Sequence, residues 1–197
     1  MALPRIAPGA PANRDEVVSG GSRRAVFLDR DGVINRAFVR DGRPYAPETL
    51  EQLEILPGVA EALQRLRKAG FLNIVVTNQP DVGAGKVARD VVASMHDRLL
   101  KDLPIDALKV CYHVEADNCE CRKPKPGMIL DAARELDVNL EHSFVVGDRW
   151  RDVAAGQRAG CRSLFIDCGY REKLPDKPYL AVNSLRQAAE LILQSEA

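Results

Sequence analysis

Short apolar runs that end at polar or glycine-containing residues alternate along the chain with amphipathic stretches. An apolar run that ends in a polar loop is typical of a buried parallel strand, and apolar residues at helical spacing indicate a helix. The expected strands are 26–28, 71–77, 107–112, 143–146 and 163–166, and the expected helices are 59–66, 88–101, 127–136, 152–159 and 184–193. This alternation predicts an α/β fold of the Rossmann-like kind, with a mainly parallel sheet between two layers of helices.

Two stretches fall outside this alternation. Residues 1–22 mix proline, glycine and charged residues with weak periodicity, so we expect an N-terminal arm followed by one domain at 23–197. Residues 36–53 form a long polar connection, and a long loop at the active edge of a sheet is more often functional than idle. We expect no inserted cap domain, because the intervals from Asp31 to Gly58 and from Thr77 to Lys123 leave room only for loops.

The composition is ordinary for a soluble globular protein, with 46% hydrophobic and 28% charged residues among 197. The 28 basic and 28 acidic residues cancel, so no overall field attracts nucleic acid or a membrane surface. No segment reaches the roughly 18 consecutive apolar residues of a membrane span, and residues 1–22 lack the apolar centre of a secretory signal. We therefore expect a cytoplasmic protein that binds neither nucleic acid nor membrane, and the oligomeric state stays open.

Two aspartates separated by one residue follow the first expected strand. Asp29 and Asp31, with Gly32 behind them, come where the run Val26-Phe27-Leu28 ends. Open α/β sheets bind ligands at the carboxyl ends of their strands, and paired carboxylates suit a hard cation or a phosphate-accepting nucleophile. An aspartate-rich turn that merely closes the strand explains this motif equally well when it is taken alone.

Three cysteines and one histidine crowd into eleven residues before an Arg-Lys pair. They are Cys111, His113, Cys119 and Cys121. Such a set matches a tetrahedral structural zinc site, whose closed shell leaves no position for catalysis. The spacing differs from common zinc-finger patterns, so the residues alone leave zinc open, although this crowding favours metal binding over disulfides. A zinc ion here would make the loop that presents Arg122 and Lys123 rigid.

Four motifs, in order, resemble those of the haloacid dehalogenase superfamily of phosphohydrolases. They are Asp29-Arg30-Asp31-Gly32, Thr77-Asn78-Gln79, Arg122-Lys123-Pro124, and Gly147-Asp148 with Asp152. The resemblance extends from about residue 24 to about residue 169. Within the superfamily the chain is most similar to the small branch, subfamily IIIA, that contains heptose bisphosphate phosphatases and histidinol-phosphate phosphatases. Its capless layout is similar to theirs, and the position of the cysteine cluster strengthens the case for zinc.

The resemblance implies a role for each motif residue. Asp29 would attack phosphorus and become an aspartyl phosphate, and Asp31 would act as general acid and base. Mg²⁺ would be held by an Asp29 oxygen, the Asp31 backbone carbonyl and Asp148, with Asp152 orienting that shell. The residues that would hold the phosphoryl oxygens are Thr77, Asn78 and Lys123.

The substrate implied by the resemblance is a small phosphorylated metabolite. The residues expected to contact it are Asn78, Gln79, Arg122, Arg149 and Arg40. The candidates for a second phosphate are Arg40 and its loop neighbours Arg36 and Arg43. The short gap between His113 and Cys119 resembles the histidinol-phosphate enzymes, whereas the Lys125-Pro126-Gly127-Met128 continuation resembles the heptose enzymes. We expect removal of the 7-phosphate of D-glycero-D-manno-heptose 1,7-bisphosphate. The alternatives are a histidinol-phosphate phosphatase and a catalytically silent, zinc-stabilised binding module.

Overall fold

The computed structural model describes residues 22–195. The arm expected at 1–22 therefore lies outside the described residues, except for Ser22. The hydroxyl of Ser22 donates a hydrogen bond to Asp137 Oδ2 at 2.8 Å. None of the helices in this described range has the length and hydropathy needed to cross a membrane.

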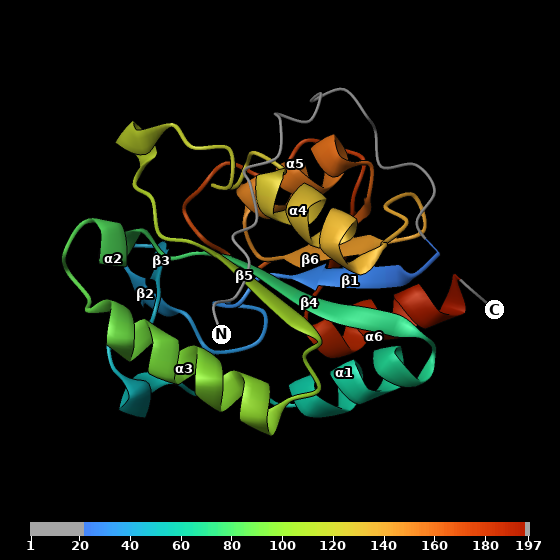
Figure 1. Cartoon of the computed structure of the whole chain (residues 1–197), viewed down its shortest axis with the longest axis horizontal. Helices are drawn as coiled ribbons and strands as arrows, with labels where there is room; N and C mark the ends of the chain where they lie inside the picture. Colours follow the sequence, from blue (N-terminus) through green and yellow to red (C-terminus); the bar gives the residue numbers. More distant parts are fainter. Residues whose placement is uncertain (1–21, 196–197) are drawn as a thin grey trace, which may run out of the picture.

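Six strands in the described range form one sheet, in the order β5-β4-β1-β6-β7-β8 (Figure 1). They are β1 (Arg24–Leu28), β4 (Phe71–Asn78), β5 (Ala107–Cys111), β6 (Phe144–Gly147), β7 (Arg162–Ile166) and β8 (Leu180–Val182). Every neighbouring pair is parallel, which confirms the expected sheet. The chain moves outward from β1 through β4 to β5 and then returns to the other side of β1 at β6. The carboxyl ends of β1 and β6 therefore lie where the strand order reverses, the usual ligand position in such sheets.

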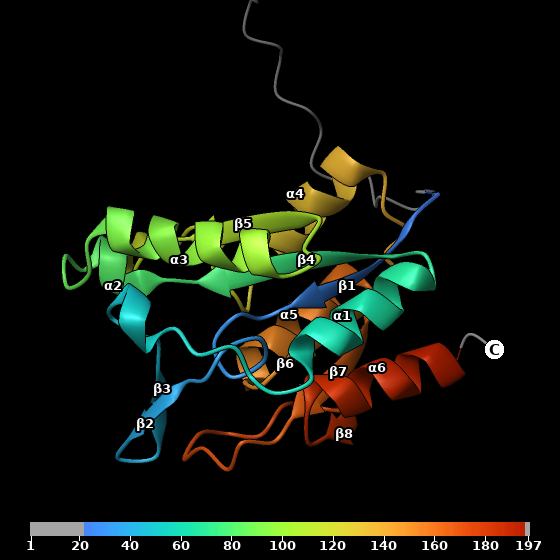
Figure 2. The same ribbon diagram turned by 90° about the horizontal axis from the view of Figure 1, so that it is seen from below.

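Helices cover both faces of the sheet (Figures 1 and 2). The helices are α1 (Val59–Lys68), α2 (Pro80–Gly83), α3 (Arg89–Asp102), α4 (Gly127–Leu136), α5 (Trp150–Ala159) and α6 (Leu185–Gln194), with 3-10 turns η1 (Leu50–Gln52) and η2 (Glu115–Asp117). Helices α1, α3 and α6 lie on one face, and α4 and α5 lie on the other. Strand β1 sends Val26 and Leu28 into the first core and Ala25 and Phe27 into the second. This alternation fixes β1 between two apolar layers and confirms the three-layer fold.

The long polar connection contains a β-hairpin, where the sequence analysis expected only a loop. Strands β2 (Phe38–Arg40) and β3 (Arg43–Tyr45) pair antiparallel. Asp41 (φ 52°) and Gly42 (φ 76°) form the two-residue turn, and Asp-Gly is a favoured pair at the positive φ angles of such a turn. Within the described chain, only this hairpin and η1 stand between β1 and α1, so no cap domain is inserted there. The short strand β8 also escaped the sequence analysis, because its three residues are too few to give a pattern.

Candidate functional site

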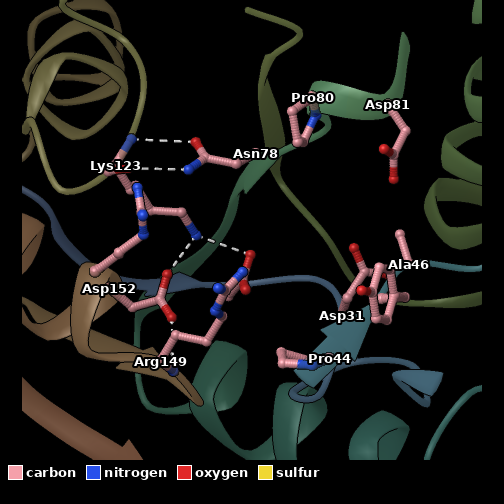
Figure 3. Close-up of a pocket in the computed structure, with 12 residues that line it drawn as sticks. Asp31, Pro44, Ala46, Asn78, Pro80, Asp81, Lys123, Arg149 and Asp152 are labelled. Atoms are coloured by element: carbon pink, nitrogen blue, oxygen red, sulfur yellow. Dashed lines mark hydrogen bonds and ion pairs between the residues drawn. The ribbon is translucent and has the colours of Figure 1, made fainter. Parts of the chain in front are cut away.

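A pocket of about 190 Å³ lies at the carboxyl edge of the sheet (Figure 3). Its lining includes Asp29 and Asp31 after β1, Lys123 from the loop after β5, and residues of the α5 N-terminus. The hairpin contributes Pro44 and Tyr45 to the opposite wall. Residues that are far apart in sequence meet here because parallel strands bring their carboxyl ends to one edge.

Lys123 is the centre of the buried charge network. Its side chain is 3% exposed, and Nζ donates to Asp29 Oδ1 at 2.8 Å and to the carbonyl oxygen of Val76 at 2.7 Å. Nζ also lies 2.6 Å from Asp152 Oδ1 (Figure 3). Asp152 uses its second oxygen to accept the backbone N–H of Arg149 at 3.0 Å, at the start of α5. Both carboxylate oxygens of Asp152 are thus engaged, one by Lys123 and the other by the α5 N-terminus.

Asp148 completes a cluster of three buried carboxylates. Oxygens of Asp29, Asp148 and Asp152 lie within 4.8 Å of one another. Asp148 Oδ2 accepts the hydroxyl of Tyr170 at 2.8 Å, whereas Oδ1 is buried and has no hydrogen-bond partner within the described chain. A side chain at Gly32 (φ 89°) would stand 1.9 Å from Asp148 Oδ2, so only glycine lets the loop after β1 approach this carboxylate. Mg²⁺ prefers oxygen ligands, and the unpartnered buried oxygen fits it.

Burial raises the pKa of Asp29 and Asp148 and tends to lower that of Lys123, yet all three pKa values end up raised. Desolvation raises the pKa of Asp29 to about 6, against the lowering effect of Lys123. Desolvation, with the charges of Asp29 and Asp152, also holds the pKa of Asp148 well above its ordinary value. Burial tends to lower the pKa of Lys123, but the two neighbouring carboxylates outweigh it and keep the pKa raised. Three carboxylates face one ammonium group, so a cation would relieve the excess negative charge.

Asp31 is held by several donors. Arg30 donates to its carboxylate through Nε at 3.1 Å and Nη2 at 3.0 Å, Asn35 donates at 2.9 Å, and Gln79 donates at 2.8 Å. Arg30 is fully buried, and its Nη1 reaches His96 Nε2 at 2.9 Å. The sequence analysis assigned no role to Arg30 or His96, and the only signal was an arginine placed between two aspartates. Gln79, expected to contact substrate, is buried, and its amide donates to Asp31.

The structure places Thr77 and Asn78 differently from each other. Thr77 is fully buried, and its hydroxyl accepts a hydrogen bond from Gln79 Nε2 at 2.9 Å. Asn78 lines the pocket, and its amide forms two reciprocal hydrogen bonds of 3.1 Å with the backbone of Lys123 (Figure 3). Asn78 therefore fixes the loop that presents Lys123, while Thr77 lies beneath the pocket lining.

The three arginines expected at the substrate are not brought together. Arg149 lines the pocket and is paired with Glu172 through Nε at 2.9 Å. Arg40 is exposed on the hairpin and pairs with Glu48 at 3.1 Å, outside the pocket lining. Arg122 donates to the carbonyl oxygen of His113 at 3.2 Å and faces a hollow beside the cysteine loop that shares Lys123 with the pocket lining. Sequence proximity to Lys123 did not determine where Arg122 points.

The cysteine and histidine cluster has the geometry of a metal site. Its members are Cys111, His113, Cys119 and Cys121. The three Sγ atoms lie 3.2–3.6 Å apart, and His113 Nδ1 lies 3.3 Å from Cys121 Sγ and 3.7 Å from Cys111 Sγ. A tetrahedron with zinc–sulfur bonds of about 2.3 Å has sulfur–sulfur edges of roughly 3.8 Å, close to these values. The cluster therefore fits a zinc ion.

The fold and the site together define an enzyme class. A carboxylate at the end of β1, a buried lysine and an oxygen-rich cation site suit the transfer of a phosphoryl group to a protein side chain. The family model for haloacid dehalogenase-like hydrolases matches residues 33–160. The chain belongs to the haloacid dehalogenase-like hydrolase family, and it is an enzyme of the phosphatase type.

Named relatives and solved structures agree with this membership. The D-glycero-beta-D-manno-heptose-1,7-bisphosphate 7-phosphatase of Rhodopseudomonas palustris is 40% identical over 72% of this chain and 82% of its own length. The D-glycero-alpha-D-manno-heptose-1,7-bisphosphate 7-phosphatase of Mycobacterium tuberculosis is 42% identical over 74% of this chain and 80% of its own. The crystal structure of D,D-heptose 1,7-bisphosphate phosphatase from B. bronchiseptica, complexed with magnesium and phosphate, is similar with a TM-score of 0.76. It is 32% identical and covers 87% of this chain and 99% of its own.

Proposed function

We propose that this chain is a magnesium-dependent phosphomonoesterase that acts through an aspartyl-phosphate intermediate on Asp29. We further propose that it removes the 7-phosphate of D-glycero-D-manno-heptose 1,7-bisphosphate, a small phosphorylated metabolite. The observation that carries the mechanism is the position of Lys123 Nζ, 2.8 Å from Asp29 and 2.6 Å from Asp152, beside the unpartnered buried oxygen of Asp148. The relatives named above support the substrate.

The chemistry follows from the residues that line the pocket. A carboxylate oxygen of Asp29 attacks phosphorus, the bond from phosphorus to the sugar oxygen breaks, and Asp31 gives its proton to the departing alkoxide. Asp31 then takes a proton from a water molecule that attacks the aspartyl phosphate, which releases inorganic phosphate and regenerates Asp29. Lys123 faces the negative charge that builds up on the phosphoryl oxygens. Arg30, Asn35 and Gln79 hold the Asp31 carboxyl at the edge of the pocket between these two proton transfers.

Two metals complete the proposal. An Asp29 oxygen, Asp148 and the Asp31 backbone carbonyl would hold Mg²⁺, which neutralises charge on the phosphoryl group when bound. The four-residue cysteine and histidine cluster would hold a structural Zn²⁺ ion. We assign zinc no chemical step, because all four positions of a tetrahedral ion are taken by protein ligands.

Phosphate release in the presence of Mg²⁺ tests the nucleophile. We expect Asp29→Asn to lower kcat by roughly 10⁴-fold or more, because the amide cannot form the intermediate. Asp81→Asn is the matched control, since Asp81 also lines the pocket but lies outside the carboxylate cluster and pairs with Lys86 at 3.4 Å. Release by Asp29→Asn at the rate of the unmodified chain would remove Asp29 as the nucleophile.

Parallel kinetics on two substrates test the specificity. We expect kcat/KM for heptose 1,7-bisphosphate to exceed that for histidinol phosphate by roughly 100-fold, a ratio that a few polar contacts can supply. Equal values, or a preference for histidinol phosphate, would contradict the proposed substrate and leave the phosphatase chemistry standing. If neither ester is hydrolysed, the result would favour the catalytically silent binding module.

A further inference from the structure

A second hollow, of about 440 Å³, adjoins the pocket on the side of the hairpin. The two share Pro44, Tyr45, Arg149 and Arg151 in their linings, so one ligand can extend from the pocket into the hollow. The charged residues that line this hollow are Arg43, Arg149, Arg151, Arg171, Lys173 and Glu172. We call it the basic hollow, because five cations there face one carboxylate.

The cations in the basic hollow are only partly neutralised. Glu172 is paired with Arg149, and Arg151 is paired with Glu115 at 3.0 Å. Within residues 22–195, no carboxylate oxygen lies within 4.0 Å of the charged nitrogens of Arg43, Arg171 or Lys173. A concave surface lined by charges of one sign concentrates ions of the other sign. The basic hollow therefore attracts anions beside the place where the reacting phosphate is expected.

One side of the basic hollow is formed by the β2–β3 hairpin and residues 171–173, which are distant in sequence and joined by a hydrogen bond. The backbone N–H of Arg171 donates to the carbonyl oxygen of Gly42 at 2.7 Å, at the turn of the hairpin. A side chain at position 42 would come within 2.6 Å of Arg171 Cγ, so glycine there lets the aliphatic part of Arg171 pack on the turn. Arg43 is the next residue on the hairpin. The fold thus brings Arg43 and Arg171 to one surface, although neither belongs to the motifs that define the family resemblance.

The opposite side of the basic hollow is also ordered. Lys173 Nζ lies 4.0 Å from the centre of the Trp150 ring, within the range of a cation–π interaction. Arg151 lies 5.0 Å from the same ring. The aromatic ring fixes the direction of both side chains. Arg151 is already paired with Glu115, whereas Lys173 has no carboxylate partner among residues 22–195, so the charge of Lys173 stays available to a ligand.

We propose that the basic hollow binds the second phosphate of a bisphosphate substrate while the first lies in the pocket beside Asp29 and Lys123. Arg43, Arg171 and Lys173 supply the unpaired charge, and guanidinium groups match phosphate oxygens with two donors each. This inference rests on the proposed function. Of the three arginines that the sequence analysis named for a second phosphate, it keeps Arg43 and leaves out Arg36 and Arg40, which do not line the basic hollow. It makes the hairpin and residues 171–173 the determinants of selection for bisphosphates over monophosphates.

The test compares two esters on the same variants. The probes are heptose 1,7-bisphosphate and p-nitrophenyl phosphate, which carries no second phosphate. For Arg43→Gln/Arg171→Gln we expect the ratio of kcat/KM between the two esters to fall by roughly 100-fold, mainly through KM for the bisphosphate. The figure assumes about tenfold for each charged hydrogen-bonding partner removed. Lys173→Gln, which leaves the packing on Gly42 intact, is expected to lower the ratio by about tenfold.

A control variant and two distinct outcomes separate failure of this inference from failure of the proposed function. Arg98→Gln/Arg186→Gln removes two exposed arginines of α3 and α6, each already paired with a carboxylate, and the ratio should stay within about twofold. If the unmodified chain hydrolyses both esters and the Arg43 and Lys173 variants keep its ratio, the basic hollow is not a phosphate site and the proposed function survives. If the unmodified chain releases phosphate from neither ester, the proposed function and this inference fail together.

Discussion

The two candidate metal sites of this chain are built in opposite ways. The carboxylate site joins Asp29, Lys123 and Asp148 from three separate segments, and all three side chains are nearly fully buried. The cysteine cluster lies within residues 111–121, and only Cys111 in it is fully buried. The first site exists only when the sheet is formed, whereas the second needs only one strand end and its loop. A site assembled over long distances is therefore tied to global stability, and a local one is tied mainly to its own loop.

The largest expected effect on stability concerns the lysine that joins the carboxylates. Lys123→Met leaves Asp29 and Asp152 buried without their cation, so the free energy of unfolding should fall by about 3–5 kcal/mol. Urea unfolding without added Mg²⁺ measures it. Lys125→Met removes a half-buried lysine that pairs with Glu120, and it should cost less than about 1 kcal/mol. Equal losses for the two variants would break the comparison, since the buried network would then contribute no more than a surface pair.

Lowering the pH should reduce the stability of the protein through the buried imidazole of His96, which contacts Arg30 next to the carboxylate site. Burial, with the charge of Arg30, lowers the pKa of His96 to about 4 from an ordinary 6.5. The unfolded chain therefore takes up a proton on His96 below pH 6.5 that the folded chain refuses until about pH 4. The stability that this histidine contributes is present above pH 6.5 and is lost as the pH falls to about 4, by about 3 kcal/mol in all.

His96→Gln isolates this effect, because glutamine can accept from Arg30 and does not titrate. Between pH 7 and pH 4, the unfolding free energy of the unmodified chain should fall by about 3 kcal/mol more than that of His96→Gln. Curves that stay parallel over this range would show that His96 is not held neutral in the folded protein.

Removing one cysteine should affect the local site first. Cys119→Ser is expected to lower the bound zinc from about one equivalent to a small fraction, because a structural site needs all four ligands. The fall in unfolding free energy should be smaller than for Lys123→Met, and kcat should fall by about tenfold (~1.4 kcal/mol) as the loop that carries Lys123 loosens. Metal analysis, urea unfolding and phosphate release measure the three.

Cys168→Ser is the control, since Cys168 is an exposed thiol outside the cluster. A purified chain that folds and holds no zinc would defeat the assignment of the cluster. A loss of stability for Cys119→Ser as large as that for Lys123→Met would erase the contrast between a local and a long-range site.

The smallest expected effect concerns the hydroxyl that orients Asp148. Tyr170→Phe removes one hydrogen bond of 2.8 Å to Oδ2, so the carboxylate is less well fixed and Mg²⁺ should bind about fivefold more weakly (~1 kcal/mol). Calorimetric titration with Mg²⁺ measures this directly. Tyr179→Phe, at a ring that packs on Phe165, should leave the affinity as it is. Tighter binding by Tyr170→Phe would mean that the hydroxyl competes with the metal.

Local patterns in the sequence predict much of this fold. The helix expected at 127–136 is α4 with the same bounds, because an apolar stripe and flanking Pro126 define it locally. Ser184, the first residue of the helix expected at 184–193, is the N-cap of α6 and accepts the backbone N–H of Gln187 at 3.3 Å. The cysteine cluster and the aspartates after β1 are equally visible, since their members are close in sequence.

Only the tertiary structure decided which of these side chains contact one another. Asp152 is paired with Lys123, Thr77 is fully buried, and Arg122 donates to His113 in the cysteine loop. The tertiary structure also joined the hairpin to residues 171–173, which created the basic hollow. Residue types and short spacings determine which chemistry is available, because they act within a turn of helix or a strand end. Which donor meets which acceptor across tens of residues depends on how the layers pack, and a local sequence pattern does not specify contacts between segments that are far apart in the chain.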